Sequence, residues 1–124
     1  MKLCYFPFSA YFRKKKISRI ICNQISHMWF GGLVTIEWWD DIWLNEGFAK
    51  CFEYLCLNEI QQKKYKYWDN FIYYKYGKVL IFDESKSTHP IVREVNSISS
   101  IDYIFDAILY AKGASVIKML KCIL

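Results

Sequence analysis

Apolar residues recur at helical spacing in four stretches of this sequence, and few residues are present that would break a helix. In residues 17–31 the apolar positions are Ile17, Ile20, Ile21, Ile25, Met28 and Trp29. Residues three and four apart share one face of an α-helix. The chain has 5 Gly and 2 Pro among 124 residues. The pattern therefore predicts a mainly α-helical fold.

The other helices are predicted from the same spacing. One covers 43–57, a second covers the aromatic-rich residues 61–80, and the last runs from Ile101 or Ala107 to the end of the chain. The last is apolar nearly all round, so we expect it to be buried. Gly31 and Gly32 are expected to end the first helix. Residues 33–38 favour a short strand or extended turn, and residues 81–100 a loop.

Composition limits the class of protein. The chain is 54% hydrophobic, which favours one small folded domain or a piece of a larger one. No apolar run reaches the roughly 18 residues that a spanning helix needs, so no transmembrane segment is predicted. We divide the chain into a poorly defined basic segment, 1–16, and a folded part, 17–124.

Charge is distributed unevenly along the chain. Residues 1–32 carry a net +6, residues 33–60 a net −5 and residues 61–124 a net +4. An acidic centre between basic flanks argues against a nucleic-acid-binding protein and is compatible with a cation or amine site. The lysines and aromatic residues around 63–78 resemble a nucleic-acid-binding surface. Their helical spacing instead favours aromatic residues in the core and lysines at its solvated rim.

Five cysteines are present: Cys4, Cys22, Cys51, Cys56 and Cys122. Their number is odd, their spacing is irregular and no C-x-x-C pair occurs. We interpret them as reduced and mostly buried. This favours a reducing compartment such as the cytoplasm, without fixing the location.

Residues 27–49 carry the most specific pattern, HMWFGGLVTIEWWDDIWLNEGFA. This segment resembles the zinc aminopeptidases related to membrane alanyl aminopeptidase and leukotriene hydrolase, a group of gluzincin metallopeptidases. Their pattern is H-E-x-x-H, eighteen residues, then the Glu of W-L-N-E-G-F-A. Eighteen residues separate His27 from Glu46 here, and residues 105–115, FDAILYAKGAS, resemble a second block of the family. The resemblance covers about 18–120.

The resemblance implies a role for several residues. His27 matches the second zinc-binding histidine, Glu46 the carboxylate ligand, and Tyr110 the phenol that stabilises the oxyanion. It also implies the helical part of a thermolysin-like catalytic domain, so residues 17–124 would be a partial peptidase domain. In the family, zinc is the cofactor and peptides are the substrates. Some relatives are soluble and others membrane-anchored.

Two positions depart from the family pattern. Asn23 stands where the first zinc histidine is expected, and Gln24 stands at the position of the general-base Glu. An amide is a poor zinc ligand, and Gln24 cannot carry a proton. Cys22 is turned away from the His27 face of the helix. We therefore expect weak or absent zinc and essentially no hydrolysis.

Three interpretations remain open at this point. The chain is an inactive fragment or paralogue of an aminopeptidase, or an active metallopeptidase with an atypical zinc site. Alternatively, it is a non-catalytic module that binds peptides or an intact relative. We also expect the apolar faces of a partial domain to be exposed.

Overall fold

The computed structural model describes residues 5–60, 66–97, 101 and 103–123. Within these ranges it is helical and contains no strand, which confirms the mainly α prediction. Helix α1 spans Tyr5–Trp29, and α2 spans Ile42–Ile60 after the short 3₁₀ turn η1, Trp39–Asp41. The remaining helices are α3 (Tyr67–Phe71), the π-helical η2 (Ile72–Tyr76), α4 (Gly77–Asp83), the π-helical η4 (Ile108–Lys112) and α5 (Gly113–Ile123).

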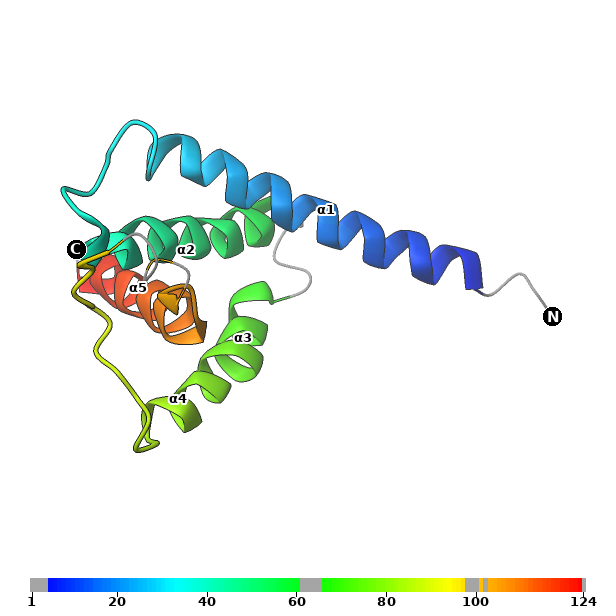
Figure 1. Ribbon diagram of the computed structural model, residues 1–124. Helices are drawn as coiled ribbons and strands as arrows, with labels where there is room; N and C mark the ends of the chain where they lie inside the picture. Colours follow the sequence, from blue (N-terminus) through cyan, green and yellow to red (C-terminus); the bar gives the residue numbers. More distant parts are fainter. Residues whose placement is uncertain (1–4, 61–65, 98–100, 102, 124) are drawn as a thin grey trace.

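Helix α1 is much longer than the predicted 17–31. It begins at Tyr5, and its N-terminal half extends beyond the other helices (Figure 1). Pro7 lies in the first turn, where the missing N–H removes no intrahelical hydrogen bond. The helix ends before Gly31, whose φ of 109° is in the left-handed region. This confirms the predicted stop at Gly31 and Gly32.

The connection after α1 is an extended turn rather than a strand. Its pairing is a single isolated bridge between Phe30 and Val34. Further along, the Trp38 indole N–H donates to the Val95 carbonyl at 3.2 Å, and the Val95 N–H donates to Asp40 Oδ1 at 2.7 Å. These two bonds attach the loop after α4 to the segment around η1, just before α2.

Helix α2 lies at the centre of the molecule and extends the predicted 43–57 by a residue or more at each end. It contacts α1, α3, η4 and α5. Ala49 and Leu57 on its faces are fully buried. Gly47 lies against Gly113, close enough that a Cβ on Gly47 would sit 3.0 Å from the Gly113 carbonyl carbon. The two glycines thus set the close approach of α2 and α5.

The aromatic segment forms three consecutive helical pieces rather than the predicted single α-helix. The pieces are α3, η2 and α4, and they continue to Asp83, beyond the predicted start of the loop at 81. Residues 61–65 of the prediction, with Tyr65, lie outside the described residues. The π-helical η2 shifts the helical register, and it leaves Tyr73 and Tyr74 exposed.

The last helix is only partly buried. Ala114 and Ile117 pack into the core, but Met119, Leu120 and Ile123 are 55%, 50% and 80% exposed. The prediction of burial all round is therefore wrong for the final turns. No element of the described part of the chain packs over them.

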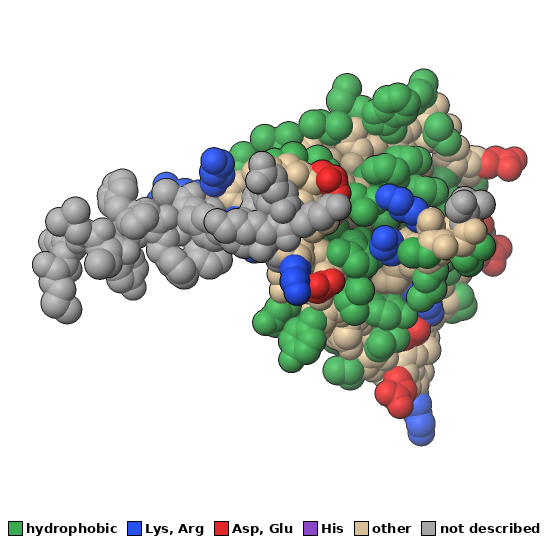
Figure 2. Space-filling model, turned by 180° about the vertical axis from the view of Figure 1, so that it is seen from behind, with side chains coloured by type: hydrophobic (Ala, Val, Ile, Leu, Met, Phe, Trp, Pro, Cys, Tyr) green, Lys and Arg blue, Asp and Glu red, His purple; other side chains and the backbone are tan. Residues whose placement is uncertain are grey.

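Apolar side chains are exposed elsewhere too, as expected for a partial domain. Figure 2 shows them over much of one face of the molecule. One group, which we call the α1 apolar face, consists of Ile17, Ile20, Ile21, Ile25 and Met28, each more than half exposed. Among the described residues, no helix is long and apolar enough to cross a membrane.

Candidate active site

His27 and Glu46 meet across the end of α1 and the start of α2. The His27 Nδ1 lies 3.3 Å from the Phe30 carbonyl oxygen, which suits an Nδ1–H donor. That bond leaves Nε2 on the other side of the ring, 3.7 Å from Glu46 Oε2. Both side chains are mostly buried, with 27% and 16% of their surfaces exposed. The structure therefore brings together the two predicted metal ligands that match the family.

Tyr110 belongs to the same electrostatic environment. It lies on the π-helical η4, and burial followed by the charge of Glu46 raises the pKa of its phenol. Burial also raises the pKa of Glu46, against the opposing charges of His27 and Lys50. The Lys50 Nζ lies 5.8 Å from the centroid of the Tyr110 ring. Glu46 therefore interacts electrostatically with His27, Lys50 and Tyr110.

Asn23 and Gln24 lie in a different hollow. It has a volume of about 270 Å³ and is lined by Lys16, Arg19, Ile20, Asn23, Gln24, Lys50 and Glu53. Three of these side chains are cationic and one is anionic. The two substituted positions therefore face a surface with a net positive charge.

Glu53 is the anion of that hollow, and sequence reasoning missed it. Its side chain is 3% exposed, and its two oxygens accept from Arg19 Nε at 2.9 Å and Lys50 Nζ at 2.7 Å. Glu53 lies seven residues after Glu46, two turns further along α2 and therefore on a similar face. The signal available in the sequence was its position between the aromatic residues Phe52 and Tyr54. A carboxylate in such a stretch is expected to have a partner, because unpaired carboxylates are rarely buried.

The residues present do not fit a catalytic zinc ion. Such an ion needs three protein ligands and an open position for water. His27 and Glu46 supply two, and the amide of Asn23 is a weak third. Within the described ranges, no group of three or more His, Cys, Asp or Glu side chains is placed to hold a metal. Arg19 and Lys50 add positive charge that would repel a divalent cation.

Cys22 does not supply the third ligand. Its thiol is buried, and its Sγ lies 2.8 Å from Cys56 Sγ on α2. Burial and the contact with Cys56 raise the pKa of Cys22 to about 12. The thiolate, which is the form that binds metal, is therefore strongly disfavoured. The sulfur points into the interface between α1 and α2, in agreement with the helical geometry.

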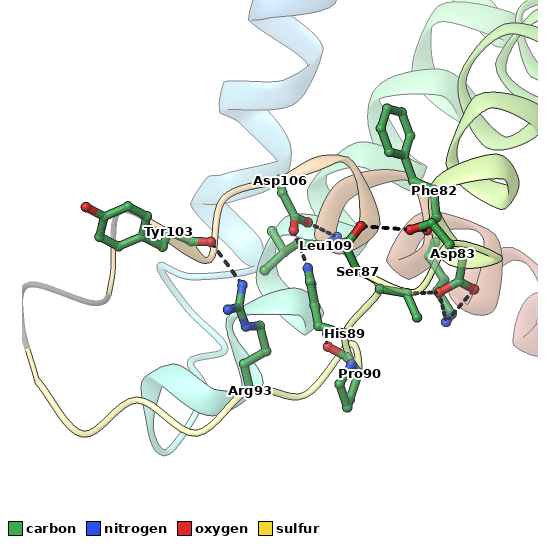
Figure 3. Close-up of polar contacts among 12 residues, drawn as sticks. Phe82, Asp83, Ser87, His89, Pro90, Arg93, Tyr103, Asp106 and Leu109 are labelled. Atoms are coloured by element: carbon green, nitrogen blue, oxygen red, sulfur yellow. Dashed lines mark hydrogen bonds and ion pairs between the residues drawn. The ribbon is translucent and has the colours of Figure 1, made fainter.

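A polar network anchors the loop after α4 beside η4 (Figure 3). His89 Nε2 contacts the Asp106 carboxylate, whose other oxygen accepts the Leu109 N–H at 3.0 Å. Lys112 Nζ contacts both Asp83 oxygens, at 2.8 and 3.0 Å. These contacts fix both ends of the η4 segment and so determine where Tyr110 lies.

The fold and this residue set define a class: the helical part of a metallopeptidase catalytic domain. The Peptidase family M1 domain matches residues 6–124, and the chain belongs to that family. It is 41% identical over 113 residues to glutamyl aminopeptidase of Bitis rhinoceros and 43% identical over 113 residues to aminopeptidase M1 of Arabidopsis thaliana. It is 38% identical over 117 residues to aminopeptidase N of Haemonchus contortus.

These alignments cover most of this chain and a small part of each relative. They include 91%, 91% and 94% of the chain, but 12%, 13% and 12% of the three relatives. The chain therefore spans about one-eighth of the length of the proteins it matches. The family resemblance found in the sequence is confirmed, and the roles of individual residues remain predictions.

Proposed function

We propose that this chain is a non-hydrolytic member of the M1 aminopeptidase family that holds no catalytic zinc. The observation that carries the proposal is the pairing of Glu53 with both Arg19 and Lys50. Two cations lie beside Asn23 and Gln24, the positions at which the family pattern has a zinc ligand and the general base. The chemistry of the hollow thus favours anions over a divalent metal.

The loss of the general base supports the same conclusion independently. Gln24 has the shape of Glu but cannot accept a proton from water or return one to a leaving amine. General acid–base catalysis is typically worth about 10²- to 10⁴-fold in rate. Glu46 lies beside His27 and influences Tyr110, but neither Glu46 nor Tyr110 replaces both missing functions. Peptide hydrolysis is therefore expected to be negligible, even though a family substrate is a peptide.

Zinc stoichiometry tests the proposal directly. The purified chain is dialysed against trace zinc and its metal content is measured by elemental analysis. We expect close to no zinc for the natural sequence and a clear gain for Asn23→His/Gln24→Glu, which restores the family pattern. A control is Asn96→His, which makes the same histidine substitution at an exposed position that does not line the hollow. One tightly held zinc in the natural chain would overturn the proposal and favour an atypical active site.

Turnover provides a second readout. An aminoacyl-arylamide should not be cleaved by the natural chain above the rate without protein. Cleavage that a chelator abolishes would contradict the proposal, because it would require a metal-dependent active site.

A second candidate function, a binding module for an intact relative, has its own supporting observation. The exposed α1 apolar face is a feature of surfaces that contact other proteins. A pull-down with a full-length M1 aminopeptidase tests this candidate. Retention of the natural chain by that relative, lost in the Ile21→Lys/Ile25→Lys variant, would favour this candidate. If the natural chain is not retained, this candidate is rejected and the non-hydrolytic proposal is unaffected.

A further inference from the structure

A second cavity, larger than the hollow at Asn23, opens between α2, η2, α4 and η4. Its volume is about 370 Å³, within the range of small-ligand sites. The walls carry three tyrosines and four cations: Tyr54, Tyr74, Tyr110, Arg19, Lys50, Lys75 and Lys78. No Asp or Glu lines it among the described residues. The cavity therefore combines aromatic walls with a strongly one-sided charge.

The four cations differ in how far they are already neutralised. Arg19 and Lys50 both contact Glu53, and Lys50 also interacts electrostatically with Glu46. Lys75 and Lys78, by contrast, have no ion-pair or hydrogen-bond partner for their side chains in the part of the chain that the structure describes. The positive charge available to a ligand therefore comes mainly from these two lysines.

The position of the two lysines also favours a shared ligand. They are three residues apart on consecutive helical turns, so their ammonium groups lie on the same side of the segment. Like charges at this spacing repel each other unless an anion lies between them. Carboxylates form short, charge-assisted hydrogen bonds with ammonium groups. The tyrosine walls supply apolar contact area and phenol groups for the rest of the ligand.

We propose that this cavity binds an acidic peptide segment, with carboxylates held by Lys75 and Lys78 and its backbone and apolar atoms packed on the tyrosines. The inference goes beyond the proposed loss of hydrolysis. It needs neither zinc nor a general base, and it is measured by binding rather than turnover. A finding of bound zinc would therefore leave it standing, and a failure to bind peptide would leave the metal result unaffected.

A peptide is favoured over a nucleic acid by the shape of the site. The lysines and tyrosines lie at a half-open cavity of about 370 Å³, whereas single-stranded nucleic acids use open grooves that follow the backbone over several nucleotides. A short peptide fits a cavity of this size, whereas an extended polyanion would have to run beyond it.

The test is fluorescence anisotropy with three labelled peptides: Ala-Glu-Glu-Ala, its Gln-Gln counterpart and its Lys-Lys counterpart. The natural chain is expected to bind the Glu-Glu peptide about tenfold more tightly than the Gln-Gln peptide. Binding should weaken as salt is raised, because the contacts are charged. The Lys-Lys peptide should not bind.

Variants assign the binding to the cavity. Lys75→Gln/Lys78→Gln should lose about tenfold in affinity for the Glu-Glu peptide. The matched control, Lys86→Gln/Lys121→Gln, removes the same charge at exposed positions that do not line the cavity and should change affinity by less than about twofold. Circular dichroism of both variants should match the natural chain, since all four lysines are exposed.

Three results would overturn the proposal. The first is no preference for the Glu-Glu peptide over the Gln-Gln peptide. The second is an equal loss of affinity in the control variant, which would mean that net charge alone attracts the peptide. The third is tighter binding of a short single-stranded oligonucleotide of the same charge, which would assign the lysines to nucleic acid.

Discussion

At the scale of single residues, the buried Glu53 carboxylate connects α1 and α2 beside Asn23 and Gln24. Removing a carboxylate from water is costly unless its oxygens are paired. Arg19 from α1 and Lys50 from α2 pair with one oxygen each. The contact therefore joins two helices.

Substitution of Arg19 tests this role. Arg19→Ala leaves the buried Glu53 with Lys50 as its remaining cation, and it also removes the packing of the guanidinium on the Tyr54 ring, 5.6 Å away. We expect a loss of about 1–3 kcal/mol in the free energy of unfolding. The measurement is urea denaturation followed by circular dichroism. Arg13→Ala, at an exposed position of the same helix, is the control and should lie within about 0.5 kcal/mol of the natural chain.

Sequence reasoning singles out some residues of this region and not others. A spaced motif predicts roles for His27, Glu46 and Tyr110, because each stands at a fixed position in a recognisable block, and these roles stay predictions. The partners of Glu53 belong to no such block. Their meeting depends on which face of α1 packs against α2, and Arg19 is as polar as the exposed cations beside it. Periodicity predicts a helix face, but it does not predict which polar residue at its edge finds a buried partner.

At the scale of elements, the crossing of α2 and α5 depends on two glycines in contact. Gly47→Ala would place a Cβ 2.9 Å from Ile117 Cδ1 and 3.0 Å from the Gly113 backbone. The side chain can move but the backbone resists, so we expect a loss of about 1–3 kcal/mol from overpacking. The melting temperature and urea midpoint should both fall. An unchanged midpoint would show that the two helices separate freely.

Gly77→Ala is the matched control for that substitution. Gly77 has helical backbone angles, and an added Cβ would meet the Ile72 carbonyl oxygen at an ordinary 3.6 Å. Because Ala loses less backbone entropy than Gly in a helix, this variant should gain about 0.5–1 kcal/mol. The same chemical change thus has opposite signs at two positions, which sequence alone does not distinguish.

The link between α4 and η4 predicts a dependence on acid. Hydrogen bonds from Lys112 and then Thr88 lower the pKa of Asp83 from its ordinary 3.8. A lowered pKa in the folded state stabilises the fold above the ordinary value, and this contribution is lost as the pH falls through the folded pKa. Between about pH 5 and pH 3, the natural chain should therefore lose more stability than Asp83→Asn. Asp69→Asn, at an exposed position, should not reduce the loss.

The sequence predicts the boundaries of some helices more accurately than those of others. The 43–57 prediction lies within α2, whose buried residues extend from Ile42 to Leu57. The stretch before Ile17 has no such stripe, so the start of α1 at Tyr5 was missed. The π-helical segments η2 and η4 were missed because each alters the helical repeat within a continuous apolar pattern. The pattern indicates that a helix is present but not which hydrogen-bond register it adopts.

At the scale of the whole molecule, the balance between buried and exposed apolar surface sets the behaviour of the isolated chain. The core is built around α2, and the α1 apolar face has no cover among the described residues. A contiguous exposed apolar surface favours association with other proteins or with further copies. We therefore expect the isolated chain to be poorly soluble.

Charged substitutions on the α1 apolar face test this expectation. The natural chain should self-associate, as measured by sedimentation at several concentrations. Ile21→Lys/Ile25→Lys should shift it towards monomer, because both side chains are about half exposed and Lys is a good helix former. Thr35→Lys/Asn96→Lys adds the same charge at exposed polar positions and should leave association largely unchanged. A natural chain that sediments as a monomer at every concentration would contradict the prediction, since net charge would then outweigh the exposed apolar face.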